Sequence, residues 1–211
     1  MSGEPRLFVG MAGGSGACYG RRLVRALVEL GWGVDLCISR AAFEVLRHEE
    51  GLVLDAAAPD LERLFGPLPS ERVRFYANER IDAPAASGSA LRRGAVIVPC
   101  SMGTLARISW GFSSCLIERV GDVALKEGCP LVLVPREAPY SALHLENMLR
   151  LAHAGAVVLP ASPGFYHRPR TIEDLVDHVV GKILDRLRIE HRLFRRWGGG
   201  DPEPIEEAGR G

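Results

Sequence analysis

The stretch RLFVGMAGGSGACYG, residues 6–20, decides the fold of this chain. Residues 7–11 form an apolar run typical of a buried strand, residues 13–16 form a tight turn of glycines and serine, and an amphipathic helix follows over residues 18–30. Glycines let backbone N–H groups approach a ligand closely, and the start of a helix carries partial positive charge. The stretch therefore predicts a phosphate-binding turn at the beginning of an α/β sheet, with a plain strand–turn–helix connection as the alternative.

This turn matches neither of the two common phosphate-binding patterns. No Lys-Ser or Lys-Thr pair follows the glycines, which excludes a Walker loop. The spacing Gly14-x-Gly16-x-x-x-Gly20 differs by one residue from the dinucleotide pattern, and the next expected strand, residues 34–38, is followed by Ser39 rather than by an acid. These departures favour a mononucleotide such as FMN.

The composition narrows the class of protein. The 211 residues are 47% hydrophobic, which suits one domain with a sizeable core. Twenty-six basic residues balance 26 acidic ones, so we expect neither a nucleic-acid partner nor a charged membrane surface, and neutrality favours an oligomer. The five scattered cysteines include no C-x-x-C pair, and the chain shows neither a signal-peptide profile nor an apolar run of membrane-spanning length. We therefore expect a cytoplasmic protein.

Strand-like and helix-like segments alternate along the chain. Apolar runs occur at residues 7–11, 34–38, 95–98, 131–134 and 156–159, and helical patterns at 18–30, 41–49, 104–108, 115–126, 143–154 and 172–187. This alternation predicts a doubly wound, mostly parallel α/β sheet in a single domain, residues 1–197, with its ligand beyond the carboxyl ends of the strands. We expect residues 55–78 to be irregular or a short surface helix, and the Gly/Pro/Glu-rich residues 198–211 to be a disordered tail.

Polar side chains follow the later strands. Ser101 and Thr104 open a helix and could hold a phosphate or a flavin edge, although an ordinary N-cap is the alternative. Arg136 and Glu137 lie between two prolines, where they could bind a phosphate and act as an acid or base, or form a surface salt bridge. Tyr166 offers a hydroxyl in the loop PGFYHRP, unless its ring packs on the core.

Weaker signals come from two further segments. Ser87 and Ser89 flank a glycine and could line a close-approach surface or a flexible link. Arg119 and Lys126 are seven residues apart and share one helix face, which could gather a phosphate dianion or simply be solvated.

Taken together, the motifs are recognisable. They are GMAGGSGACYG, CISRAA, ASGS, PCSMGTL, LIERVGDVALKE, PLVLVPREAP, HLENML and PGFYHRP, and they extend over residues 6–197. The chain closely resembles the flavin prenyltransferase (UbiX) family, which is similar in fold to the homo-oligomeric flavin-containing Cys decarboxylases. The resemblance implies a Rossmann-like sheet and a homo-oligomer, commonly a dodecamer.

The resemblance also implies a reaction. A dimethylallyl group would pass from dimethylallyl (mono)phosphate to N5 and C6 of reduced FMN without a metal ion, and the chain has no Asp-rich D-D-x-x-D motif. The product, prenylated FMN, would serve a UbiD-type decarboxylase, in many bacteria for ubiquinone biosynthesis.

The family's functional residues carry over as follows. FMN would be bound by Gly13, Gly14, Ser15, Ser39, Ser101, Met102, Gly103, Thr104 and Arg136. The prenyl substrate would be bound by Ser87, Ser89, Arg119 of a neighbouring subunit, Lys126, Glu137, Tyr166 and Lys182. The implied catalytic residues are Ser15 and Glu49, for the proton at C6, and Lys126 and Glu137, for the leaving phosphate. Trp197 would help to close the pocket.

Three departures and two alternatives accompany the resemblance. Ala12 and Gly14 stand where Ser or Thr and Ala are usual, and Ile81 stands where some members have an aromatic residue. The first alternative is a flavin-dependent Cys decarboxylase, which typically needs a His after the second strand and an Asn motif near the third, where this chain reads SRAAF and CSMGT. The second is a non-catalytic FMN-binding subunit, which the set Lys126, Arg136, Glu137 and Tyr166 argues against.

Overall fold

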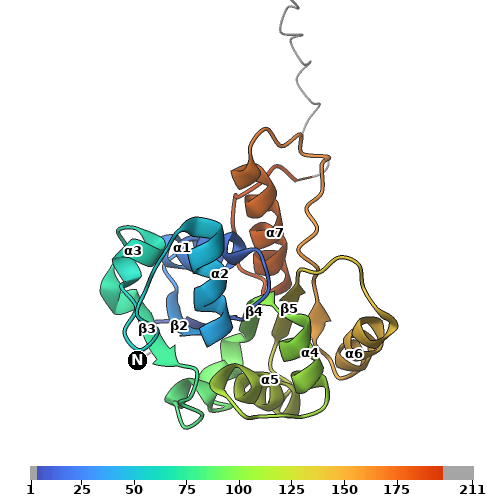
Figure 1. The fold of residues 1–211 in the computed structure, drawn as a ribbon. Coiled ribbons are helices and arrows are strands. Elements are labelled where there is room, and N and C mark those ends of the chain that lie inside the picture. Colours follow the sequence, from blue (N-terminus) through green and yellow to red (C-terminus); the bar gives the residue numbers. More distant parts are fainter. Residues whose placement is uncertain (1–3, 197–211) are drawn as a thin grey trace, which may run out of the picture.

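A six-stranded sheet forms the centre of the computed structural model, which describes residues 4–196 (Figure 1). Its strands are β1 (Arg6–Met11), β2 (Gly33–Ile38), β3 (Val73–Ala77), β4 (Ala95–Cys100), β5 (Leu131–Pro135) and β6 (Val157–Val158). They lie in the order β3-β2-β1-β4-β5-β6, and each neighbouring pair is parallel. The predicted doubly wound, Rossmann-like α/β fold is confirmed.

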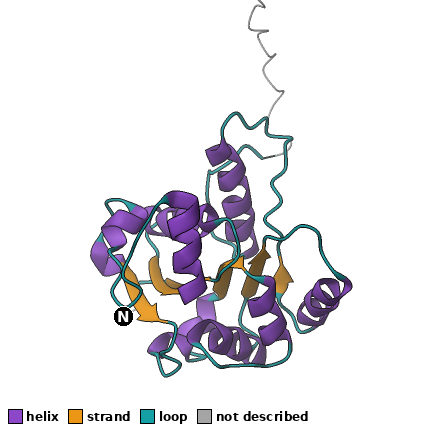
Figure 2. Cartoon of the chain, viewed as in Figure 1, coloured by secondary structure: helices purple, strands orange, loops and turns teal. Residues whose placement is uncertain are grey.

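Helices cover both faces of the sheet (Figure 2). One face carries α1 (Ala17–Glu29), α2 (Arg40–Glu50), α3 (Leu61–Phe65) and α7 (Ile172–Arg186). The other carries α4 (Met102–Ser109), α5 (Leu116–Glu127) and α6 (Ala142–His153). Three short 3-10 turns complete the described elements: η1 (Ser70–Arg72), η2 (Pro84–Ala86) and η3 (Ala90–Arg93).

The apolar runs in the sequence become strands because both of their faces are covered. Every residue of β2, β4 and β5 is buried, as expected for a parallel sheet between two helical layers. Neighbouring side chains alternate between the two cores: Leu7 and Val9 pack towards α1 and α7, whereas Phe8 packs towards α4 and α5.

The expectation that residues 55–78 are irregular or a short helix agrees with α3, a helix of five residues, but it missed a strand. Strand β3 pairs with β2 from Val34↔Val73 to Ile38↔Ala77. As an edge strand β3 buries only Val73 fully and exposes Arg74, so it lacks the continuous apolar run by which the inner strands are recognised.

Two other sequence expectations concern the ends of the chain and the membrane. Within residues 4–196, no helix has the length and apolar character needed to cross a bilayer. Trp197, with its expected role in closing the pocket, and the expected tail at residues 198–211 lie outside the described residues.

Candidate functional site

The strand order places a topological switch point between β1 and β4. From β1 the chain continues into α1 on one face of the sheet, and from β4 it continues into α4 on the other. In open α/β sheets, ligands bind at such a switch point, outside the carboxyl ends of the strands. The turn at residues 13–16 and the turn at Ser101 both lie at this edge.

The glycine turn after β1 is wedged between two neighbouring loops. A Cβ at Gly13 would lie 2.6 Å from the Cβ of Ala41 in α2, which no real side chain tolerates. A Cβ at Gly14 would lie 3.3 Å from the Pro99 Cβ and 3.5 Å from the Ser101 backbone nitrogen. The glycines therefore bring the ends of β1, β2 and β4 into one continuous surface.

Two helices begin on this surface with a serine N-cap. The Ser39 hydroxyl accepts a hydrogen bond from the Ala42 N–H at 3.1 Å at the start of α2. The Ser101 hydroxyl accepts from the Thr104 N–H at 3.2 Å and donates to the Thr104 hydroxyl at 3.0 Å at the start of α4. Ser39 and Ser101 are thus N-caps, and the two helix starts provide backbone donors and positive dipole ends for an anion.

The residues at the start of α4 differ in access. The side chain of Met102 is buried in the core, whereas Gly103 is exposed, and a Cβ there would meet nothing within 4 Å. Of the two, Gly103 offers the open backbone surface.

The N-terminus of α1 is already filled by a carboxylate. The Gly16 N–H donates to both Glu49 carboxylate oxygens, at 3.1 and 3.0 Å, and the Ala17 N–H donates to one of them at 3.0 Å. The Gly16 and Ala17 amides thus hold Glu49 in this structure, and the phosphate-binding role of the turn at residues 13–16 stays a prediction. The starts of α2 and α4 are further candidates for a phosphate.

Glu49 and Ser15, which the sequence paired, are in contact. Partial desolvation raises the pKa of Glu49. Hydrogen bonds from the Ser15 hydroxyl and from the Ala17 and Gly16 amides, together with the charge of Arg136, lower the pKa by more than desolvation raises it. The pKa of Glu49 therefore lies below its usual range. Glu49 is therefore an ionised carboxylate at neutral pH, beside a hydroxyl that can pass on a proton.

Arg136 joins the end of β5 to the same turn. Its Nε donates to the Ser15 carbonyl oxygen at 3.4 Å. The adjacent Glu137 accepts from the Ala138 N–H at 3.0 Å. Burial and the charge of Glu137 raise the pKa of the Tyr140 hydroxyl, whereas the charge of Arg136 lowers it by less. Tyr140 is therefore close to both Arg136 and Glu137. The sequence analysis did not select Tyr140, although its position just beyond the PREAP segment was a usable signal.

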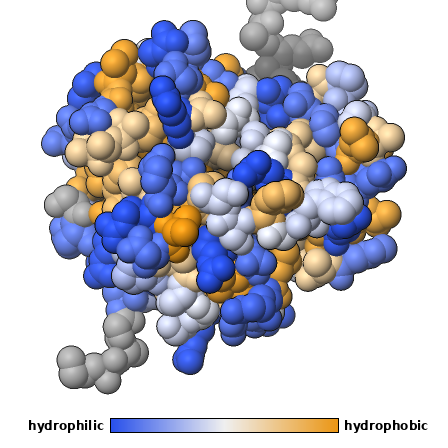
Figure 3. Space-filling model, turned by 60° about the horizontal axis from the view of Figure 1, so that its bottom comes forward, coloured by the Kyte–Doolittle hydropathy of each residue, from blue (hydrophilic) through white to orange (hydrophobic). Residues whose placement is uncertain are grey.

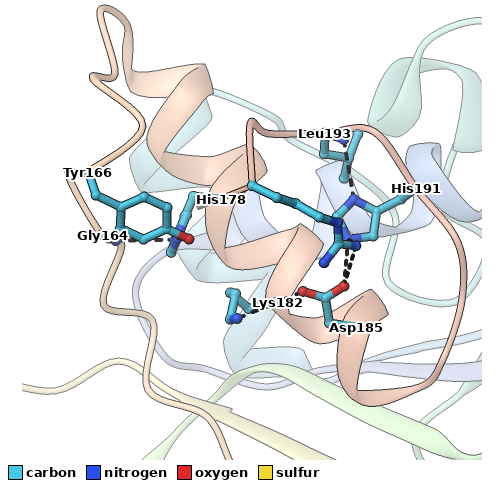
Figure 4. A network of polar contacts seen from close by, with 8 residues as sticks. Gly164, Tyr166, His178, Lys182, Asp185, His191 and Leu193 are labelled. Atoms are coloured by element: carbon cyan, nitrogen blue, oxygen red, sulfur yellow. Dashed lines mark hydrogen bonds and ion pairs between the residues drawn. The ribbon is translucent and has the colours of Figure 1, made fainter. Parts of the chain in front are cut away.

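A second group of polar residues lies along the middle and the second half of α7 (Figure 4). The Tyr166 hydroxyl lies 3.1 Å from Nε2 of His178, and Lys182 follows one turn later on α7. The Lys182 ammonium lies 3.8 Å from the Asp185 carboxylate. Tyr166 and Lys182 thus both lie near His178, which the sequence analysis missed because a single histidine in a helix carries no pattern.

Lys126, Ser87 and Ser89 lie at the opposite edge of the sheet. Lys126 is in the last turn of α5, which returns the chain to the amino end of β5, and its ammonium lies 3.1 Å from Glu127. A Cβ at Gly88 would lie 2.8 Å from the Glu127 Cγ, so the Ser87–Ser89 turn sits on the same end of α5. Lys126 and Glu137 of one chain are therefore not neighbours.

Arg119, the remaining residue of the expected set, is exposed on α5. Its guanidinium lies 4.0 Å from the Asp122 carboxylate, within the same helix. Within one chain, the two cations of α5 are thus held by acidic residues of α5 itself.

The parallel sheet, its switch point and two serine-capped helix starts form an arrangement that suits a nucleotide phosphate, as in flavoproteins. Residues 1–184 match the Flavoprotein family model, and the chain belongs to this family. More narrowly, it belongs to the flavin prenyltransferases: it is 50% identical to the flavin prenyltransferase UbiX of Halalkalibacterium halodurans over 190 residues, which cover 90% of this chain and 92% of the relative.

Two solved structures extend the comparison to three dimensions. AnUbiX (PadA1), in complex with FMN and dimethylallyl pyrophosphate, is 38% identical with a TM-score of 0.83 over 94% of this chain and 100% of its own. A dodecameric FMN-dependent UbiX-like decarboxylase from Escherichia coli O157:H7 is 39% identical with a TM-score of 0.80 over 92% and 99% of the two chains.

Proposed function

We propose that this chain transfers a dimethylallyl group from dimethylallyl phosphate to N5 and C6 of reduced FMN. The observation that carries the proposal is its likeness, over nearly the whole chain, both to flavin prenyltransferases and to a structure that holds FMN with a dimethylallyl donor. The chain's own residues at the carboxyl edge of the sheet suit both substrates.

FMN fits the donors at the carboxyl edge. Its phosphate would lie at the starts of α2 and α4, where Ser39, Ser101 and the first-turn amides offer hydrogen bonds. The flavin would lie against the Gly13–Gly14 surface and Arg136. Reduced flavin supplies an electron-rich nitrogen as the prenyl acceptor.

The departing phosphate requires positive charge and hydrogen-bond donors. Arg136, Tyr166 and Lys182 supply these from one chain, and they stabilise charge that develops as the allylic C–O bond breaks. Glu137, beside Arg136, would donate a proton to the leaving group or orient it. Ser15 and Glu49 would take up the proton that C6 of the flavin loses, with the hydroxyl as the intermediate carrier.

Lys126 reaches such a site only from another copy of the chain. We infer a homo-oligomer in which α5 of one copy, with Lys126, Arg119 and the Ser87–Ser89 turn, completes the carboxyl-edge site of the next. The E. coli relative is dodecameric, and we propose the same assembly here.

The surface supports association of this kind. Large apolar side chains are exposed on α6 and on the segment that follows α4: Trp110, Phe112, Leu143, Leu145 and Leu149 are each more than half exposed in one chain. Figure 3 shows apolar patches interspersed with hydrophilic residues on the face that it brings forward. Apolar area of this extent is typical of protein–protein contacts.

The product would be consumed by a UbiD-type decarboxylase that uses prenylated FMN. We place the reaction in the cytoplasm, because the five cysteines are all free thiols in the structure, as suits a reducing compartment.

A parallel assay tests the proposal against its two alternatives. The protein receives dithionite-reduced FMN with dimethylallyl monophosphate in one reaction and oxidised FMN with a cysteine-terminated peptide in another. We expect the flavin to be modified and the peptide to keep its carboxyl group. Decarboxylation of the peptide would favour the Cys decarboxylase, and no change in either would favour a non-catalytic FMN-binding subunit.

A further inference from the structure

His178 is a buried polar residue to which the proposed reaction gives no role. It is 5% exposed and lies on the inward face of α7. Its two ring nitrogens each make a hydrogen bond: the Gly164 N–H donates to Nδ1 at 3.2 Å, and Nε2 lies 3.1 Å from the Tyr166 hydroxyl oxygen (Figure 4). The His167 ring stacks on it, with ring centres 4.8 Å apart and planes 4° from parallel.

The Gly164 amide fixes the tautomer of this histidine. A backbone N–H can only donate, so Nδ1 of His178 must present its lone pair. A neutral imidazole with a bare Nδ1 carries its proton on Nε2, which then donates to the Tyr166 oxygen. Because that oxygen accepts at this contact, the hydroxyl hydrogen of Tyr166 points away from the imidazole.

The surroundings favour the neutral form. Burial lowers the pKa of His178, the charges of His167 and Lys182 lower it further, and Asp185 opposes them without reversing the direction. Protonation would also set a second N–H of His178 against the Gly164 amide. The tautomer that the hydrogen bonds require is therefore the one that the environment stabilises.

Tyr166 and Lys182 lie on the same side of α7. His178 and Lys182 are four residues apart and share one helix face, and Tyr166 contacts that face through His178 (Figure 4). A hydroxyl donor and an ammonium group on one face suit a phosphate, whose oxygens only accept in its dianionic form.

We propose that His178 is a positioning residue for prenyl transfer: it holds the Tyr166 hydroxyl as a hydrogen-bond donor to the phosphate of the prenyl substrate. This inference rests on the proposed function and assigns His178 a task within it. The competing role is that His178 only anchors the loop of residues 162–170 through Gly164.

Two substitutions separate these roles. The amide of asparagine reaches about as far as Nδ1 of histidine, and the amide of glutamine about as far as Nε2. His178→Asn can thus keep an acceptor for the Gly164 N–H and lose the donor to Tyr166, whereas His178→Gln can keep the donor and lose the acceptor.

The experiment measures the KM for dimethylallyl monophosphate and the Kd for FMN in the full-length, FMN-loaded protein. Tyr166→Phe removes a hydrogen bond to a charged phosphate and should raise the KM by about 10-fold or more. We expect His178→Asn to raise the KM by a similar factor and His178→Gln to stay within about threefold of the unchanged protein, with FMN affinity kept by all three. In the Tyr166→Phe background, neither His178 substitution should raise the KM further.

Other results would overturn the inference. A larger effect of His178→Gln than of His178→Asn, or loss of FMN binding in both, would assign His178 to loop anchoring. Additive effects in the double variants would show that it does not act through Tyr166. If Tyr166→Phe alone leaves the KM unchanged, the positioning role falls with it, whereas prenylation of FMN by the unchanged protein decides the proposed function separately.

Discussion

Glu49, near the end of α2, accepts hydrogen bonds from the N–H of Gly16, the residue just before α1, through both carboxylate oxygens at 3.1 and 3.0 Å. Gly16 has a φ of 100°, in the left-handed region that favours glycine. As the N-cap residue of α1, it has no side chain that could accept a hydrogen bond from the first turn of the helix. The carboxylate therefore replaces a local N-cap, and it satisfies helix donors while it faces Ser15.

We expect Glu49→Gln to lower the free energy of unfolding by about 1 kcal/mol at neutral pH and low salt, after allowance for the exposure of the side chain. The folded-state pKa of Glu49 is lowered, so its stabilisation is present above the ordinary pKa of a glutamate and is lost as the pH falls through the folded value. The difference between variant and unchanged protein should therefore shrink at acidic pH.

Urea unfolding at fixed protein concentration measures this difference. Glu44→Gln, an exposed carboxylate on the same helix that pairs only with Arg47 among the described ion pairs, is the matched control and should change stability by much less. A difference for Glu49→Gln that does not depend on pH would exclude its charge as the cause.

Replacement of the serines at the starts of α2 and α4 should weaken FMN binding. Ser39→Ala and Ser101→Ala each remove a hydroxyl at the expected phosphate position, and we expect FMN to bind roughly 5- to 10-fold more weakly in each. Fluorescence quenching of FMN gives the affinities. Asp60→Ala removes the N-cap of α3 instead, and should affect only stability. Equal weakening by all three would mean that helix stability, not phosphate contact, controls binding.

Glu137→Gln tests the proposed acid. The change keeps the shape of the side chain and its contact with the Ala138 amide but removes the ionisable group. Loss of a general acid usually slows a reaction by about 10²-fold or more, and we expect this slowing in single-turnover prenyl transfer, with FMN affinity retained. Transfer at an unchanged rate would make Glu137 structural, and loss of FMN would place it in the flavin site.

The sequence was sufficient for the sheet and for the turn after β1 because both depend on local pattern. Buried parallel strands are continuous apolar runs, and the glycines at 13 and 14 stand where neighbouring loops leave no room for a Cβ. Strand β3 escaped detection because an edge strand needs only a few apolar residues.

The contacts of Glu49 and His178 could not be predicted in this way. Glu49 reaches the start of α1 from 33 residues further along the chain, and His178 reaches Tyr166 across a loop. Such pairings depend on how the helices pack, for which one sequence has no periodic signal. The sequence likewise grouped Lys126 with Glu137 by function, and the topology places them at opposite edges of one chain.

Mixing two inactive variants tests the shared site. If Lys126 and Glu137 of one site come from different chains, a 1:1 mixture of Lys126→Ala and Glu137→Gln subunits should contain intact sites, roughly a quarter of the total after random exchange. The measurement is the amplitude of single-turnover prenylation before and after subunit exchange. A mixture no more active than its components, with exchange verified, would contradict a shared site.

The most direct test of prenyl transfer is the mass of the flavin itself. The protein is incubated with dimethylallyl monophosphate and either reduced or oxidised FMN, and the flavin is released and weighed by mass spectrometry. We expect the flavin from the reduced sample alone to gain the mass of one dimethylallyl unit. Unmodified FMN from the reduced sample, with the protein folded and the flavin bound, would contradict the account.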